Sequence, residues 1–295
     1  MIRSADGRVG AAEHPEAAAA AAPRTPKAML YTARFIPEDM LVNRPEGAES
    51  RVRAERSAPV PQISIVIPAY NESENLVPLW EELRSTLVTL KRSFEVIIVD
   101  DGSRDATLDV LRSIRRAAPE LRILRFGSNS GQTAAFLAGF AAARGDVVVT
   151  LDADRQNDPA DIASLLARIP EYDAAVGFRA RRRDSWVRLA SSRVANAVRN
   201  ALSGDDIIDT GCTLKAFRRE CLDELPRFSG MHRFFPTLIR MRGFRVCQLP
   251  VGHRPRVAGR SKYGIGNRVF RAFHDLLAVR WMKSRRIHYT VTEES

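Results

Sequence analysis

At 295 residues with 45% hydrophobic content, the chain is long enough to bury a full α/β core, and its formal net charge of +11 predicts an anionic partner. Its three cysteines, Cys212, Cys221 and Cys247, lack both the spacing of a zinc site and the even count of a secreted disulfide framework, which favours a reducing cytosolic compartment. No stretch approaches the roughly 18–20 apolar residues that a membrane span needs, so we expect a soluble or peripheral protein.

Residues 1–60 mix an alanine run with scattered proline, glycine and charged residues, without a sustained helical or strand period, and we interpret them as a mostly disordered tail. The pattern changes at Gln62, where short β-branched runs begin to alternate with amphipathic stretches. Strands are predicted at 63–68, 95–100, 122–126 and 146–151, and helices at 74–90, 107–118 and 133–143.

The second half of the chain is less regular. We expect a helix after Asp158-Pro159 that runs to about Arg168, a strand at 173–177 and a basic segment from Arg179 to Arg199. Short apolar runs and turns follow to about Pro255, and a last helix is predicted over about 267–283. Strands that alternate with helices indicate an α/β fold with a mostly parallel sheet covered on both faces.

Acidic residues follow three of the predicted strands. The first strand leads into Pro68-Ala-Tyr-Asn-Glu72, the second ends in Asp100-Asp101, and the fourth is followed by Asp152-Ala-Asp154. Ligands of such sheets bind at the carboxyl ends of the strands, so we expect these clusters to converge on one edge.

The Asp152-Ala-Asp154 pair is the strongest candidate for chemistry. Two ionised carboxylates held close together need a cation or hydrogen-bond donors, and Mg²⁺ or Mn²⁺ would supply that charge and bridge a diphosphate. An Asp-x-Asp alone also fits a strand-end turn that caps the next helix. The acidic residues after two other strands favour the functional interpretation.

Three segments together resemble a known family. In order and spacing, the motifs at 68–72, 99–107 and 151–156 are similar to those of the GT-A glycosyltransferases of family 2, over about 63–263. Gln156 and the later segment Arg256-Val-Ala-Gly-Arg-Ser-Lys-Tyr263 look most like dolichol-phosphate mannose synthase and bacterial polyprenyl-phosphate glycosyltransferases. The resemblance implies a GT-A catalytic domain at 61–264 between the tail and a basic C-terminal segment at 265–295.

The resemblance also implies roles on the donor side. Pro68, Tyr70, Glu72 and Asp101 would frame the nucleotide, with Asp100 as an alternative or additional contact and Asp152 beside them. Asp152, Asp154 and Gln156 would hold Mg²⁺ or Mn²⁺ and the donor diphosphate, which places Asp154 among the catalytic residues. A metal there would stabilise the charge that develops on the departing nucleoside diphosphate.

On the acceptor side, Arg179, Arg188 and Ser192 match positions that grip the acceptor phosphate in the mannose synthases, and guanidinium groups suit phosphate oxygens. Each of these arginines taken singly also fits a solvated surface charge. The resemblance further assigns diphosphate or acceptor binding to a mobile loop that contains Arg256, Ser261 and Lys262.

Asp209 matches a later acidic residue of the family, which can orient the acceptor or accept a proton from a hydroxyl. An alternative is a turn aspartate before Gly211.

Many polyprenyl-phosphate transferases carry two transmembrane helices after this loop, whereas here one amphipathic stretch follows. Its apolar residues, including Phe270, Phe273 and Trp281, are interleaved with Arg271, Arg280 and other basic residues. Such a helix suits an anionic lipid headgroup region, although packing on the catalytic domain or on a second subunit stays open.

We therefore expect an inverting, metal-dependent glycosyltransferase that moves a sugar from a nucleotide sugar to a polyprenyl phosphate. We place it in the cytoplasm, peripheral at the cytoplasmic face of the membrane. The alternative within the family is a soluble or polysaccharide hydroxyl acceptor, for which Asp209 would be a general base. Nucleic acid binding is disfavoured because helix-turn-helix and aromatic-interleaved basic signatures are lacking and the acidic strand ends would repel phosphates.

Overall fold

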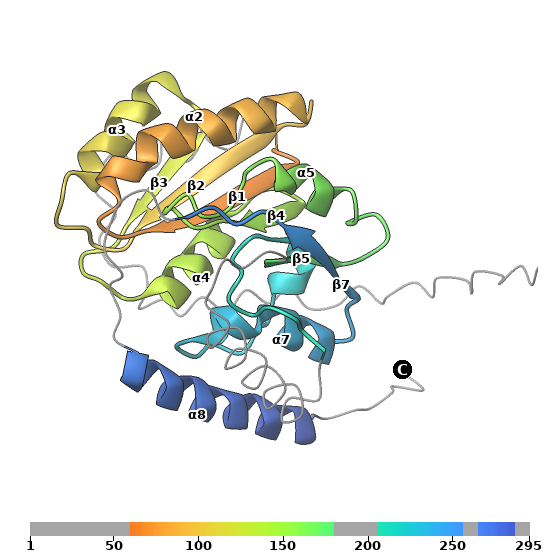
Figure 1. Cartoon of the computed structure of the whole chain (residues 1–295). Coiled ribbons are helices and arrows are strands. Elements are labelled where there is room, and N and C mark those ends of the chain that lie inside the picture. The colour runs from red at the N-terminus through yellow and green to blue at the C-terminus, as the bar shows by residue number, and fades with distance from the viewer. Residues whose placement is uncertain (1–59, 180–205, 256–264, 287–295) are drawn as a thin grey trace, which may run out of the picture. The chain divides into compact units, whose positions relative to one another are not determined.

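The fold is seen in a computed structural model that describes residues 60–179, 206–255 and 265–286, with side chains in the last segment from Phe273 onward. All but the last residue of the tail predicted at 1–60, most of the basic segment and the predicted loop around Ser261 lie outside the described residues. Figure 1 labels the elements along the chain.

The first half of the described chain forms four parallel strands joined by helices, as the alternation of runs predicts. Strands β1 and β2 pair in parallel, β3 lies beside β2, and β4 lies on the other side of β1. In chain order the elements are β1 (Ile63–Ala69), α2 (Ser73–Thr89), β2 (Phe94–Asp100), α3 (Thr107–Ala117), β3 (Leu121–Arg125), α4 (Gln132–Ala142) and β4 (Val147–Thr150).

The second half extends this sheet. Strand β6 pairs antiparallel with both β4 and β5, and β7 pairs in parallel with β5, giving the order β3-β2-β1-β4-β6-β5-β7. The predicted mostly parallel sheet is thereby confirmed. The elements are α5 (Asp161–Leu166), β5 (Ala174–Arg179), β6 (Lys215–Arg218), η2 (Arg219–Leu222), η3 (Met231–Phe234), α7 (Phe235–Met241), β7 (Val246–Val251) and α8 (Ile265–Ser284).

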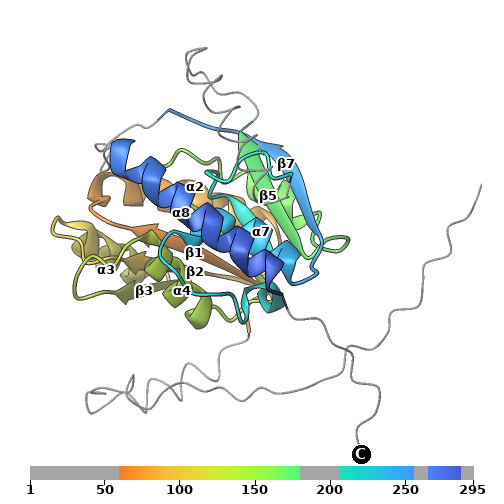
Figure 2. The same cartoon turned by 90° about the horizontal axis from the view of Figure 1, so that it is seen from below.

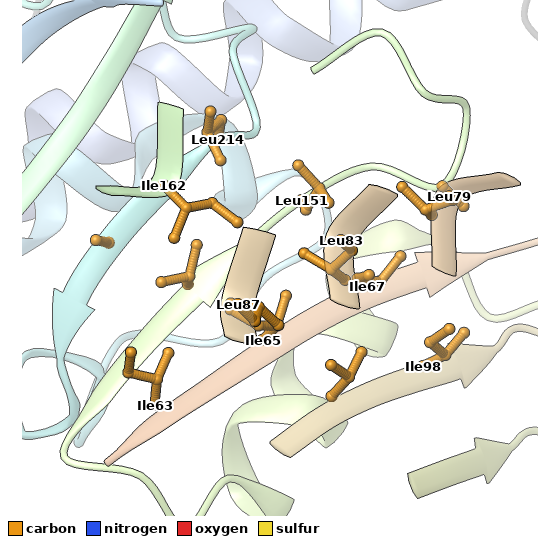
Figure 3. Packing of buried hydrophobic residues seen from close by; sticks show 14 of the residues in the cluster. Ile63, Ile65, Ile67, Leu79, Leu83, Leu87, Ile98, Leu151, Ile162 and Leu214 are labelled. Atoms are coloured by element: carbon orange, nitrogen blue, oxygen red, sulfur yellow. The ribbon is translucent and has the colours of Figure 1, made fainter. Parts of the chain in front are cut away.

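Each face of the sheet has its own hydrophobic core because successive side chains of a strand point to opposite faces. Ile63, Ile65 and Ile67 of β1 pack with α2 and α5, in the cluster drawn in Figure 3. Val66, between them, belongs to the second cluster with side chains of α4, α7 and α8. The views in Figures 1 and 2 accordingly show α2 on one side of the sheet and α4, α7 and α8 on the other.

Helix α8 confirms the helix predicted near the end of the chain. Leu276 and Val279 are buried in the second cluster. Within the described residues, no helix combines the length and the apolar character required to cross a bilayer.

Candidate active site

A pocket of about 340 Å³ opens at the carboxyl ends of the parallel strands, within the size range of small-molecule sites. Residues at or just after the ends of β1, β2, β4, β5 and β7 line it, together with residues just before β6, because antiparallel β6 begins at the edge where its neighbours end. The lining comprises Pro68, Ala69, Tyr70, Glu72, Asp101, Gln132, Asp152, Ala153, Asp154, Gln156, Asn157, Arg179, Gly211, Cys212, Thr213 and His253.

The pocket brings together most of the residues that the sequence singled out. Acidic side chains that follow three separate strands line it, and so does Arg179. Two predicted residues, Asp100 and Asp209, are not part of the lining. Arg188, Ser192, Arg256, Ser261 and Lys262 lie outside the described residues.

The Asp152-Ala-Asp154 pair lies just after β4. Burial and the neighbouring negative charge of Asp154 raise the pKa of Asp152 to about 6, although Lys215 and Arg179 act in the opposite direction. Asp152 Oδ1 accepts a hydrogen bond of 2.9 Å from Gln132 Nε2 at the start of α4. The pocket therefore disfavours the negative charge of Asp152.

These residues fit a divalent cation whose coordination is completed by a ligand. Mg²⁺ is commonly bound by one or two carboxylates together with substrate phosphates and water. Among the described residues no group of three or more His, Cys, Asp or Glu side chains is arranged to hold a metal by itself. Asp152 and Asp154 are the two carboxylates that the pocket offers at one strand end, and a cation would relieve the cost expressed in the raised pKa of Asp152.

The two aspartates that end and follow β2 make different contacts. Asp101 accepts hydrogen bonds from the backbone N–H groups of Ser130, at 2.6 Å, and Gly131, at 2.9 Å. Asp100 is fully buried and accepts the N–H of Ser103 at 2.9 Å. Asp101 thus borders the pocket and shapes the loop that leads to Gln132, whereas Asp100 holds its own turn.

Arg179 and Asp209 form a two-pronged ion pair. Arg179 Nε lies 2.7 Å from Asp209 Oδ2, and Nη2 lies 2.9 Å from Oδ1. Asp209 Oδ1 also accepts the N–H of Gly211 at 3.0 Å. The pair fixes the Arg179 guanidinium at the pocket wall, and an added Cβ at Gly211 would lie only 2.9 Å from Arg179 Nη2.

Several site residues were missed by the sequence interpretation. Lys215, 2% exposed at the start of β6, donates to the carbonyl of Cys212, and burial lowers its pKa. Asn157 follows the metal motif, and its Oδ1 accepts the Thr213 hydroxyl at 2.9 Å. His253 lines the pocket beside Asn157, with which it forms a β-bridge. Only the place of Asn157 directly after the motif offered a signal.

Comparisons with known proteins identify the family of the chain. Residues 64–226 match the family model "Glycosyl transferase family 2". Dodecaprenyl-phosphate galacturonate synthase of Rhizobium johnstonii is 38% identical over 224 residues, which are 74% of this chain and 66% of that protein. Undecaprenyl-phosphate 4-deoxy-4-formamido-L-arabinose transferase of Aeromonas hydrophila is 37% identical over 69% of this chain and 63% of the relative. The chain thus spans about two thirds of the length of these relatives.

Solved structures share the fold. Glucosyl-3-phosphoglycerate synthase from Mycobacterium tuberculosis, in complex with Mn²⁺ and UDP-glucose, aligns with a TM-score of 0.54 at 21% identity, over 82% of this chain and 84% of that one. A mannosyltransferase from Pyrobaculum calidifontis, in complex with GDP-mannose and Mn²⁺, gives 0.51 at 23% identity, over 83% and 73%. At these identities the likeness establishes the GT-A fold, as predicted.

Proposed function

Because the chain belongs to glycosyltransferase family 2, we propose that it transfers a sugar with inversion from a nucleotide sugar to a polyprenyl phosphate. This proposal rests on one observation: the carboxylates after β4 and Arg179 at the end of β5 line the same pocket. The names of the curated relatives, which are polyprenyl-phosphate sugar transferases, support the acceptor class.

On the donor side, Asp152, Asp154 and Gln156 would hold Mg²⁺ or Mn²⁺. The ion would neutralise the charge that develops on the leaving nucleoside diphosphate. Pro68, Tyr70 and the other lining residues from β1 and β2 would frame the nucleoside. Gln132 orients Asp152 through its 2.9 Å hydrogen bond, so that the carboxylate is preorganised before a ligand arrives.

On the acceptor side, the state of Asp209 favours a phosphate over a hydroxyl. Both of its oxygens accept hydrogen bonds from Arg179, and such pairing stabilises the carboxylate as an anion and weakens it as a base. A phosphate needs no general base, since it is already an anion at neutral pH. We assign Asp209 the role of holding Arg179, whose guanidinium would face the acceptor phosphate, with Arg188, Ser192, Arg256, Ser261 and Lys262 as further contacts.

The acceptor class is tested by sugar transfer with purified protein. UDP- and GDP-sugars would be offered with undecaprenyl phosphate or with soluble hydroxyl acceptors, with Mn²⁺ or with EDTA, and the products measured by mass spectrometry. We expect an undecaprenyl-phosphate sugar only with Mn²⁺, and none from Asp154→Asn. Transfer to hydroxyl acceptors alone would establish the alternative function instead.

We further propose that α8 holds the protein at an anionic membrane surface, on the cytoplasmic side. Phe273, Leu277 and Trp281 recur every four residues, so they share one face of the helix, and they are 45%, 42% and 62% exposed. Leu276 and Val279 are buried in the core, so the two sets lie on different faces. Arg280 and Lys283 are exposed on the same helix, which suits anionic headgroups around an apolar stripe.

Liposome flotation tests the α8 stripe. A triple variant, Phe273→Ser with Leu277→Ser and Trp281→Ser, should lose most of its binding to phosphatidylglycerol vesicles. Val77→Ser with Val88→Ser is a matched control, because these valines are 45% and 56% exposed on α2, and it should float like the unmodified chain. Equal flotation of all three would reject the membrane role, and a lower mass of the triple variant in sedimentation would assign the stripe to a second subunit.

A further inference from the structure

Four charged side chains form a network beside the metal motif, among residues that the proposed mechanism does not use. Glu82 of α2 pairs through Oε1 with Arg155 Nη2 and through Oε2 with Arg254 Nη1, the latter at 2.6 Å. Arg254 Nη2 in turn lies 2.8 Å from Asp158 Oδ2. One carboxylate on α2 thus joins the loop after β4 to the segment after β7.

The backbone of this loop is held at the same place. Arg155 has a φ of 61°, in the left-handed region that residues with a side chain rarely adopt, and it lies between Asp154 and Gln156. The N–H of Arg254 donates to the carbonyl of Gln156 at 2.8 Å. The direction in which Asp154 and Gln156 face the pocket therefore depends on a costly conformation at Arg155.

The Glu82 contacts are more than an ordinary surface pair. The Glu82 and Arg155 side chains are 32% and 20% exposed, whereas Arg84, two residues further along α2, is 52% exposed in its pair with Glu120. Partial burial tends to raise the pKa of Glu82, but the hydrogen bonds and positive charges of Arg155 and Arg254 outweigh it and lower that pKa. A carboxylate that bridges two guanidinium groups through charge-assisted hydrogen bonds holds both groups in place.

We propose that Glu82 is a positioning residue for the metal and diphosphate site: by holding Arg155 and Arg254 together, it keeps the loop at 154–156 in its binding conformation. This inference rests on the proposed function, since it needs the loop to bind a metal and diphosphate. Glu82 acts from behind the loop, because it is not among the residues that line the pocket. Its loss should therefore weaken metal binding without removing a ligand.

The test compares Glu82→Gln with Glu81→Gln, a matched control that removes the same charge from the neighbouring, exposed position of α2. Binding of Mn²⁺, alone and with UDP or GDP, would be measured by electron paramagnetic resonance and calorimetry, and the melting temperature by calorimetry. We expect Glu82→Gln to weaken Mn²⁺ and nucleotide binding about tenfold, as supporting residues of metal sites do. The control should bind like the unmodified chain.

Arg155→Met provides a second variant that breaks the loop contact while leaving the Glu82 to Arg254 pair in place. If Glu82 and Arg155 act as one unit, the double variant, Glu82→Gln with Arg155→Met, should bind Mn²⁺ about as weakly as the single variant with the lower affinity. If Glu82→Gln does not fold, the binding of Mn²⁺ and nucleotide by Arg155→Met tests the proposal instead.

The outcomes separate this inference from the proposed function. Unchanged Mn²⁺ and nucleotide binding in folded Glu82→Gln or Arg155→Met, beside normal binding by the unmodified chain, would overturn the positioning role alone. Failure of the unmodified chain to bind any nucleotide with Mn²⁺ would overturn the proposed function and this inference with it.

Discussion

Asp152 loses its proton near neutral pH in a pocket that opposes its ionisation. Burial and the Asp154 charge raise its pKa from an ordinary 3.8 to about 6. Above pH 6 the folded and unfolded chains have both released this proton, so the folded state carries the whole cost of the charge. As the pH falls from 6 towards 3.8, the folded state regains the proton before the unfolded state does, and the cost disappears.

Asp152→Asn should therefore stabilise the metal-free protein at neutral pH while impairing its function. Asparagine keeps an oxygen for the Gln132 hydrogen bond and removes the charge. In EDTA we expect the melting temperature to rise by about 2–4 °C at pH 7.5, as for about 1 kcal/mol in a domain of this size, and the gain to vanish near pH 4. Asp109→Asn, at an exposed position of α3, should show no such gain. An equal gain at both pH values would contradict the explanation.

Some site residues were predictable from the sequence because their charge is unfavourable in the place where they lie. Acidic pairs at the ends of apolar strands, such as Asp152 and Asp154, conflict with their surroundings unless a ligand is bound, and this conflict is visible in the sequence. Lys215 and Gln132 were not predictable, because a lysine in an irregular stretch and a glutamine opening a helix are common on surfaces. Their roles depend on which strands become neighbours, and only the sheet order establishes that.

At the scale of elements, the turn after β2 packs directly on the loop before α4. Gly102 has a φ of 69°, and a Cβ added there would lie 2.6 Å from the carbonyl carbon of Ser128 and 2.8 Å from the nitrogen of Asn129. These are backbone atoms, so the clash would displace the loop whose N–H groups bind Asp101. The β2 turn and the α4 loop therefore position each other at the pocket.

Gly102→Ala and Gly243→Ala form a matched pair. Gly243 has a φ of 89° but no atom within 4 Å of an added Cβ, so alanine there meets only the left-handed backbone cost of about 1–2 kcal/mol. We expect urea unfolding to show a further loss of about 1–3 kcal/mol for Gly102→Ala, in the range of overpacked sites, together with weaker nucleotide binding. Equal losses in the two variants would show that the loop can move aside at little cost.

Strand prediction succeeded for β1 to β5, including β3 with its two arginines, and missed β6 and β7, which fall in the stretch interpreted only as short apolar runs and turns. The run at 95–100, for example, lies inside the parallel sheet, and its own sequence is enough to indicate a strand. Strand β6 is four residues long and starts with Lys215, and β7, next to β5 at one end of the sheet order, contains Pro250. Proline is tolerated on edge strands, but it weakens the sequence signal for a strand.

At the scale of the molecule, the chain has a net positive charge, whereas most of the charged residues that line the pocket are acidic. The chain carries a net charge of +11, yet Glu72, Asp101, Asp152 and Asp154 line the pocket. A nucleoside diphosphate would be drawn towards the protein as a whole but would meet carboxylates in the pocket proposed to bind its phosphates. Metal and nucleotide should therefore bind with positive coupling, because each supplies charge that the other needs.

Thermal unfolding measures this coupling, because a ligand that binds only the folded state stabilises it and raises the melting temperature. A ligand at about 100 times its dissociation constant adds about 2.7 kcal/mol, which corresponds to roughly 5–10 °C in a domain of this size. With Mn²⁺ and the correct nucleoside diphosphate together we expect a shift of this order, and with either one alone a much smaller shift. EDTA should reverse it, while Asp154→Asn should abolish it because the metal would lose one of its two proposed carboxylate ligands. An equal shift with nucleotide alone in EDTA would mean that Arg179 and other cationic side chains bind the diphosphate without a metal, and the carboxylates would then need another role.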